Sequence, residues 1–269
     1  GDFSNVWDLY IKANSSDKVL MDHWINAEIK EVIAQQQDGT ATFIKEIFKG
    51  RAFVLKGEHI SVFFKTGENQ TIRSEQVHLF TKEIGLNITP NYIRKGRMEF
   101  QLYVENGMTG KELGILEDEL PELNLLDWLI FQGDRNSGNF LITPEGNILA
   151  IDNGDALTGG DIGIIDEIGK KEYMSLFTDK IWLSFSNRTD DEWNDLFKRA
   201  KISNPSVQKL LFEKINKINH TMEGFLEDDP QFFQHAKLFR SLRKSSLGNT
   251  VQFKAKAKTL FSQPQANCN

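Results

Sequence analysis

The sequence has little cysteine, little proline and no long apolar run, and each shortage excludes a class of protein. Its one cysteine, Cys268, cannot form a disulfide within the chain or a cysteine cluster for zinc, which indicates a reducing compartment. No apolar run reaches the ~18 residues of a membrane span. The first residues have neither a basic nor an apolar signal region. We therefore expect a soluble protein without a disulfide scaffold.

The residues that are present predict a globular chain with a large core. Hydrophobic residues make up 39% of the 269 residues, charged residues 26%, and there are 20 phenylalanines. This composition excludes a low-complexity or fibrous chain. No internal repeat and no Pro/Gly/Ser-rich linker divides the sequence, so any second domain joins closely to the first.

Charge is distributed unevenly along the chain. From residue 231 onward there is no Asp or Glu, but there are seven basic residues, namely Lys237, Arg240, Arg243, Lys244, Lys254, Lys256 and Lys258. The net charge of −6 therefore divides into +7 for this segment and −13 for residues 1–230. An acidic body argues against nucleic-acid binding, whereas the basic tail is expected to dock on that body or to meet an anionic partner.

The order of patterns predicts a β-rich first half and a helical second half. After a helix over residues 16–37, short β-branched and aromatic segments at 41–48, 51–56 and 60–65 predict an antiparallel meander. A helix opened by Ser74 and ended by Gly85 precedes two further strands at 91–93 and 98–104. Helices are then expected from Pro121, from the capping box of Thr189 and Glu192, and from Pro205, with a hairpin over 140–152.

One segment carries the clearest chemical signal. The run Gln132-Gly133-Asp134-Arg135-Asn136-Ser137-Gly138-Asn139 lies between an apolar helix and the hairpin, and Asp152-Asn153-Gly154 follows the hairpin. This order places Asp134, Asn139 and Asp152 around one cleft. Phosphoryl transfer from ATP needs carboxylate and amide oxygens to hold Mg²⁺ and a further carboxylate to orient the attacking hydroxyl. A solvated turn is the alternative, but such a turn does not require the second acidic element after a hairpin.

The spacing resembles that of kinases. Asp134 and Asn139 are separated as Asp and Asn are in the kinase catalytic loop, and an Asp-x-Gly turn follows the hairpin. The chain is similar to the atypical kinases that include the HipA-like and phosphatidylinositol 3/4-kinase-like proteins, specifically over residues 123–157 and diffusely over 40–122. The resemblance implies an α+β, two-lobed protein-kinase-like fold, with an N-lobe over residues 1–105 and a helical C-lobe over 106–269.

The resemblance also implies roles for individual residues. Asp134 would be the catalytic base or hydroxyl-orienting group, Arg135 would brace the loop or a phosphate, and Asn139 and Asp152 would be the Mg²⁺ ligands. Backbone groups of Val104 and Glu105 would hold the adenine of ATP. The turn at residues 48–51 has one glycine, so a Gly-rich phosphate loop is absent.

Kinases also need a lysine on the third strand and a glutamate on the next helix to hold it. Glu75 is expected in the first turn of that helix. Two lysines compete for the other role. Lys65 is the third-strand residue if strands begin at Thr42, Arg51 and Ile60, and Lys56 is that residue if an earlier strand is counted. We favour Lys65, because residues 57–59 make a natural hairpin turn.

These features together predict an ATP- and Mg²⁺-dependent kinase. The preferred acceptor is a protein Ser or Thr, because the acidic body offers no broad attraction to anionic bilayers. A phosphoinositide acceptor is the alternative, with the basic tail over 237–258 as a head-group or membrane contact. A pseudokinase that binds nucleotide or a partner is a third hypothesis. The resemblance implies a bacterial protein of the cytoplasm, or of a host cytosol if it is a secreted effector.

Overall fold

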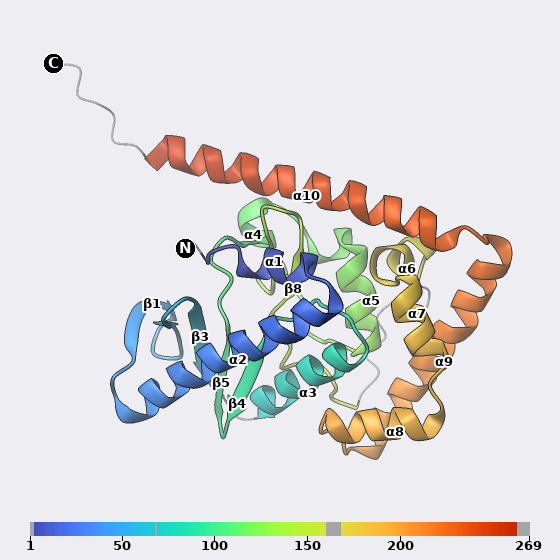
Figure 1. The fold of residues 1–269 in the computed structure, drawn as a ribbon, viewed down its shortest axis with the longest axis horizontal. Coiled ribbons are helices and arrows are strands. Elements are labelled where there is room, and N and C mark those ends of the chain that lie inside the picture. The colour runs from blue at the N-terminus through green and yellow to red at the C-terminus, as the bar shows by residue number, and fades with distance from the viewer. Residues whose placement is uncertain (1–2, 68, 160–167, 263–269) are drawn as a thin grey trace.

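The computed structural model describes residues 3–67, 69–159 and 168–262, which form a β-sheet N-terminal region and a helical C-terminal part (Figure 1). The N-terminal sheet is antiparallel with the order β1-β2-β3-β5-β4. Its strands are β1 (Thr42–Phe48), β2 (Ala52–Lys56), β3 (Ser61–Thr66), β4 (Tyr92–Lys95) and β5 (Met98–Leu102). This is the α+β architecture that the sequence predicts.

The sheet separates an apolar layer from a polar one because neighbouring strand residues point to opposite faces. On one face, Val62, Phe64 and Phe100 pack with Ile25 and Ile29 of helix α2 (Ser15–Asp38) in one buried cluster. Figure 1 shows α2 lying across β4 and β5. The alternate residues of β3 and β5, which include Lys65 and Glu99, belong to the opposite face. The strand pattern thus decides which side chains are available to a ligand.

Helix α3 (Asn69–Glu83) connects β3 to β4 and is longer than the sequence pattern indicates. The prediction that it opens at Ser74 is wrong, because the helix already includes residues 69–73 and Ser74 is buried inside it. Its end agrees with the prediction. Gly85 has a φ of +80°, and the N–H groups of Gly85 and Leu86 close the last turn on Lys82 and Thr81.

The C-terminal part combines a small sheet with a set of helices. Its elements are β6 (Met108–Thr109), α4 (Gly110–Leu113), η1 (Glu117–Glu119), α5 (Pro121–Leu129), β7 (Phe140–Ile142), β8 (Ile148–Ala150), α6 (Lys170–Leu176), α7 (Asp179–Ser186), α8 (Asp190–Arg199), α9 (Pro205–Asp228) and α10 (Phe232–Ser262). The three predicted helix starts are confirmed, the first being Pro121 at the start of α5. Thr189 and Glu192 form the capping box of α8, and Asn204 caps α9 with Pro205 at its first position.

Several helices were not predicted, and two of them contact the β7–β8 hairpin. Helix α1 (Val6–Lys12) buries Asp8, which accepts hydrogen bonds from Thr143 Oγ1 at 2.5 Å and Asn147 Nδ2 at 2.7 Å. Helix α10 crosses the hairpin turn at Gly248, where an added Cβ would lie 2.5 Å from the carbonyl oxygen of Pro144. Only glycine permits this close crossing, which directs the rest of α10 along the molecule (Figure 1). None of the helices in the described ranges is long and apolar enough to span a bilayer.

Candidate active site

A cleft of about 880 Å³ lies between the polar face of the sheet and the helical part. Its walls come from segments far apart in the sequence, which include β1, β3, β5 with the connection that follows it, the loop before β7, the turn after β8, and α10. Its size is that of a typical small-molecule site. The cleft brings Lys65, Asn139 and Asp152 to one place, together with Val104 and Glu105.

Lys65 and Asp152 form an ion pair across this cleft. The Lys65 Nζ atom lies 3.2 Å from Asp152 Oδ1, and the two side chains are 22% and 44% exposed. The strand register explains why Lys56 is not at this site. Lys65 lies opposite Ala52, whereas Lys56 lies opposite Ser61 at the other end of β2, where it is exposed. Of the two candidate lysines, Lys65 is therefore the one that lines the cleft, and the assignment of Lys56 to the phosphates is corrected.

Glu75 does not hold Lys65 as the sequence suggested. Because α3 begins at Asn69, Glu75 lies in the second turn of the helix, where it is buried. Its Oε1 atom lies 3.2 Å from both Arg94 Nε and Lys201 Nζ. Glu75 thus joins α3 to β4 and to the segment between α8 and α9. The contact that we expected between Glu75 and Lys65 is replaced by this one.

The carboxylate near Lys65 on the sheet is Glu99, which the sequence analysis did not single out. Glu99 lies directly opposite Lys65 in the β3–β5 register and accepts a 2.8 Å hydrogen bond from the Tyr92 hydroxyl. Burial raises the pKa of Glu99, and the Tyr92 hydrogen bond and the charge of Lys65 offset part of that rise. The signal was present in the sequence, since Glu99 and Gln101 alternate with Met98, Phe100 and Leu102 in the strand.

Arg135 holds the loop before β7 in its conformation. Its guanidinium donates to both carboxylate oxygens of Asp127 at 2.9–3.1 Å, and Nη1 donates to the carbonyls of Asn139 and Ile151 at 2.8 Å each. Nη2 also donates to Asn153 Oδ1 at 2.6 Å. The side chain is 5% exposed, so Arg135 braces the protein rather than contacting a phosphate. Burial raises the pKa of Asp127, and Arg135 opposes that rise.

Asn153 follows Asp152 in the turn after β8. Its Nδ2 atom donates to the Ala150 carbonyl at 3.3 Å, and its Oδ1 atom accepts from Arg135. Asn153 is buried. The residue therefore connects the turn after β8 to the loop before β7 through polar contacts.

Asn139 and Asp152 offer oxygen atoms to the cleft. Asn139 Nδ2 donates to the Asp134 carbonyl at 2.7 Å, which orients the amide and leaves Oδ1 as its acceptor end. Asp152 has a φ of +54°, and Gln132 Nε2 donates to its carbonyl at 3.3 Å. Aspartate is among the residues that tolerate this backbone region. A carboxylate and an amide oxygen are hard donors, so this pair fits Mg²⁺.

Asp134 lies on the same loop with an exposed side chain, outside the cleft lining. The Asn139 hydrogen bond to its backbone joins it directly to the cleft wall. An exposed carboxylate beside the cleft is accessible to a second substrate. The geometry thus separates Asp134, which faces solvent, from Asn139 and Asp152, which face the cleft.

The connection after β5 has backbone groups suited to a flat, polar ring. Among the described residues, the N–H groups of Val104 and Glu105 have no hydrogen-bond partner, whereas the Val104 carbonyl accepts from Gly107 N at 3.2 Å. The Glu105 side chain accepts from the Ser61 hydroxyl at 2.5 Å. The available N–H groups are those of the segment that was expected to hold adenine.

Helix α10 is part of the cleft, which the sequence did not reveal. Residues 251, 255, 258, 259 and 262 line it, a spacing that defines one helix face. Lys258 Nζ also lies 3.9 Å from Glu112 Oε1. No sequence pattern indicates this contact, because it depends on the crossing at Gly248.

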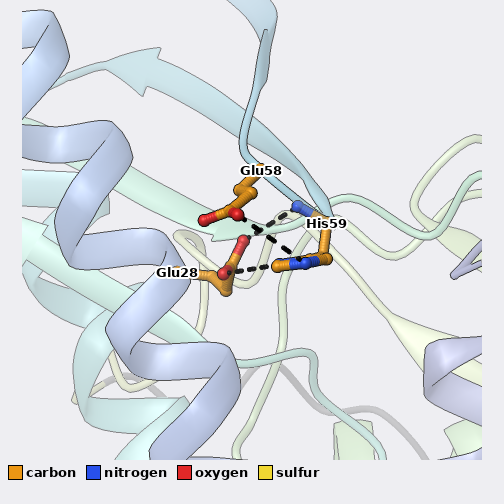
Figure 2. A group of neighbouring side chains, drawn as sticks. All are labelled: Glu28, Glu58 and His59. Carbon is orange, nitrogen blue, oxygen red and sulfur yellow. Dashed lines mark hydrogen bonds and ion pairs between the residues drawn. The ribbon is translucent and has the colours of Figure 1, made fainter.

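A second group of polar side chains lies away from the cleft (Figure 2). Glu28, Glu58 and His59 place ligand atoms within 4.8 Å of one another. Glu28 already accepts from His59 Nδ1 and from His59 N at 3.0 Å each, and so joins α2 to the β2–β3 hairpin. Glu58 is 78% exposed and lies 3.9 Å from His59 Nε2. These contacts give the group a structural role without an ion.

Comparisons with known proteins add one resemblance. No protein-family model matches the chain, and no curated protein does. Among solved structures, one match is the crystal structure of a Helicobacter pylori proinflammatory kinase, CtkA, with 11% sequence identity and a TM-score of 0.38. The match covers 77% of this chain and 95% of that chain. Membership of the HipA-like or phosphatidylinositol 3/4-kinase-like group therefore stays a prediction.

Proposed function

We propose that this protein is a Mg²⁺- and ATP-dependent phosphotransferase that acts on a hydroxyl group. The observation that carries the proposal is the convergence of Lys65, Asn139 and Asp152 on one cleft, with Lys65 Nζ and Asp152 Oδ1 3.2 Å apart. A cation beside two oxygen donors is the arrangement that phosphates and a divalent ion require together. The three residues come from separate segments of the chain, so their closeness in space does not follow from closeness in the sequence.

Each residue has a distinct task in this proposal. Lys65 would contact the phosphates, and Asn139 and Asp152 would hold Mg²⁺, which offsets the charge of the transferring phosphoryl group. Asp134 would accept the proton of the attacking hydroxyl. The hydroxyl oxygen then forms a bond to the γ-phosphorus while the bond between this phosphorus and ADP breaks. Arg135 would act as a positioning residue, since its donors are engaged by protein acceptors.

The adenine would lie against Val104 and Glu105, whose N–H groups are available. Glu99 would tune the site through Lys65, which lies opposite it in the sheet. Glu75 has no place in this mechanism, because it is engaged with Arg94 and Lys201. The proposal thus uses a sheet carboxylate where the sequence suggested a helix carboxylate.

A protein Ser or Thr is the acceptor that we propose. The exposed position of Asp134 supports a bulky second substrate. A phosphoinositide is the second candidate, favoured by the basic helix α10 that lines one wall of the cleft. The two differ in what must reach Asp134: a flexible peptide segment or a head group at a membrane surface.

Transfer of radiolabel from γ-labelled ATP to mixed proteins and lipids tests the proposal. We expect Asp134→Asn to abolish transfer while Mg²⁺-ATP still binds, because this residue acts on the hydroxyl and not on the nucleotide. Asp118→Asn, an exposed aspartate of η1 outside the cleft, is the matched control and should retain activity. Undiminished transfer by Asp134→Asn would overturn the assignment. Nucleotide binding without transfer by the unaltered protein would make it a pseudokinase.

A further inference from the structure

The last helix has a face that the cleft and the core do not use. Helix α10 runs along one edge of the molecule (Figure 1). Besides Phe261, four large apolar side chains on it are exposed, by 61%, 63%, 71% and 70%, and we call these four the outer stripe: Leu238, Leu242, Phe253 and Leu260. At 3.6 residues per turn these positions fall within a sector about 60° wide. They thus form one line along the helix.

The outer stripe is separate from the faces that α10 uses within the protein. Phe232, Ala236, Leu247 and Val251 are buried on the core side of the helix. By the same helical spacing, the stripe lies on roughly the opposite side from these residues, and the cleft-lining residues fall between the two. Binding at the stripe therefore leaves the core and the cleft wall in place.

Six of the seven basic residues of α10 form two sets, which the sequence alone did not separate, and the seventh, Lys258, lines the cleft near Glu112. Arg243 is ion-paired with Glu122, and Arg240 donates to the carbonyls of Met174 and Phe177. Burial lowers the pKa of Lys244. Arg240 and Arg243 are thus engaged by the protein, and Lys244, although exposed, lies by helical spacing on the side of α10 away from the outer stripe.

The second set faces solvent beside the outer stripe. Lys237, Lys254 and Lys256 are exposed, and no salt bridge between described residues involves them. By helical spacing, Lys256 lies within the angular sector of the stripe. Lys237 and Lys254 lie about 100° beyond its two edges. No acidic residue occurs in α10. Apolar side chains flanked by lysines and without a negative charge are complementary to the surface of an anionic bilayer.

We propose that the outward face of α10, formed by the outer stripe and these three lysines, is an interfacial membrane-binding surface selective for anionic lipid. The stripe would enter the boundary between head groups and acyl chains, and the lysine stems would extend to the phosphates. The length of the helix and its place at the edge of the molecule allow it to lie flat on a bilayer (Figure 1). The inference goes beyond phosphotransfer and does not depend on it.

Flotation of the full chain with vesicles tests the proposal. We expect binding to phosphatidylcholine vesicles that contain roughly one-third phosphatidylserine, little binding to phosphatidylcholine alone, and loss of binding at high salt. Changing the outer stripe to serine at all four positions should weaken binding by more than about tenfold. Changing the three lysines to glutamine should do the same, since each contributes roughly fivefold.

A matched control uses four exposed apolar residues from other elements. Changing them to serine removes similar side chains and should leave vesicle binding unchanged; they are Leu20, Phe43, Leu116 and Leu183. Mg²⁺-ATP affinity, which should be the same in all variants, reports on folding and separates this inference from the proposed function. Equal binding to neutral and anionic vesicles, or no loss in the stripe variant, would overturn the proposal. Self-association of the soluble chain that the stripe variant abolishes would assign this face to a second copy instead, and so would also overturn it.

Discussion

The two sides of the cleft are built very differently. On the helical side, Arg135 connects the loop before β7 to α5 and to the turn after β8 through one guanidinium, in a side chain that is 5% exposed. On the sheet side, every residue of β1 is exposed, including Ile47 and Phe48, which line the cleft. The difference indicates that the helical side, which we call the floor, is preorganised to hold charged groups in fixed positions. The sheet side, which we call the roof, has few contacts to lose when it moves.

The largest effect is expected from removing the brace of the floor. Arg135→Ala leaves the buried carboxylate of Asp127 without its partner, and we expect a loss of about 3–5 kcal/mol in the free energy of unfolding together with loss of phosphotransfer. Denaturant unfolding and the labelled-ATP assay measure the two effects. The double variant Asp127→Leu/Arg135→Met is the control, because it removes both charges and should recover much of the stability but not the activity. A stable, active Arg135→Ala variant would contradict the preorganised floor.

A second contact stabilises the floor from the N-terminus. Asp8 is buried and accepts hydrogen bonds from Thr143 and Asn147 of the β7–β8 hairpin. Asp8→Ala leaves these buried donors without an acceptor, so we expect a loss of about 1–3 kcal/mol in unfolding free energy. Asp17→Ala, at an exposed site in the first turn of α2, should cost less. Equal losses in the two variants would show that α1 does not brace the hairpin.

The roof side has its own buried polar residue in α3, and this gives a pH dependence. Burial lowers the pKa of His78 to about 3, with Lys82 adding to the decrease and Asp22 opposing it. An unfolded histidine titrates near 6.5, so between roughly pH 6.5 and 3 the unfolded chain binds one more proton at this site. Stability should therefore fall as the pH falls through this window, by at most about 1.4 kcal/mol per pH unit.

The measurement for His78 is the slope of unfolding free energy against pH. His78→Gln should have a shallower slope than the unaltered protein over this window, whatever its absolute stability. Identical slopes would mean that His78 is not held neutral in the fold.

The smallest stability effect is expected on β1 itself. Phe48 is 64% exposed, so Phe48→Ser should change the unfolding free energy by less than about 0.5 kcal/mol. Because Phe48 lines the cleft, the same change should weaken nucleotide binding. Phe43→Ser, on the same strand and 55% exposed but outside the cleft lining, should leave nucleotide binding unchanged. Equal affinities in these two variants would remove β1 from the site.

Local signals in the sequence were sufficient for much of the fold. The glycine that ends α3, the capping box of α8 and the proline that begins α9 each act within a few residues, and each helix boundary agrees with its signal. The strands of the five-stranded sheet were predicted to within two residues because their alternation reflects a sheet with one apolar and one polar face, whereas the short strand β6 was not predicted. These features depend on contacts between residues that are close in the sequence, so they can be predicted from it.

Long-range contacts could not be predicted in the same way. Glu75 meets Arg94 and Lys201, and the latter lies 126 residues away in the chain. The crossing at Gly248 that brings α10 to the cleft likewise depends on a turn about a hundred residues earlier. Nothing near either residue in the sequence indicates its partner. The same holds for Asp8 of α1, because its hydrogen-bond partners lie in the distant β7–β8 hairpin.

The central claim is that Lys65, Asn139 and Asp152 form one site for Mg²⁺ and nucleotide, and isothermal titration calorimetry with ATP tests it most directly. The account predicts that the protein binds ATP, that Mg²⁺ strengthens the binding, and that Asp152→Ala abolishes this Mg²⁺ dependence while Glu58→Ala, in the cluster away from the cleft, retains it. Absence of ATP binding, or the same Mg²⁺ dependence in Asp152→Ala as in the unaltered protein, would contradict it.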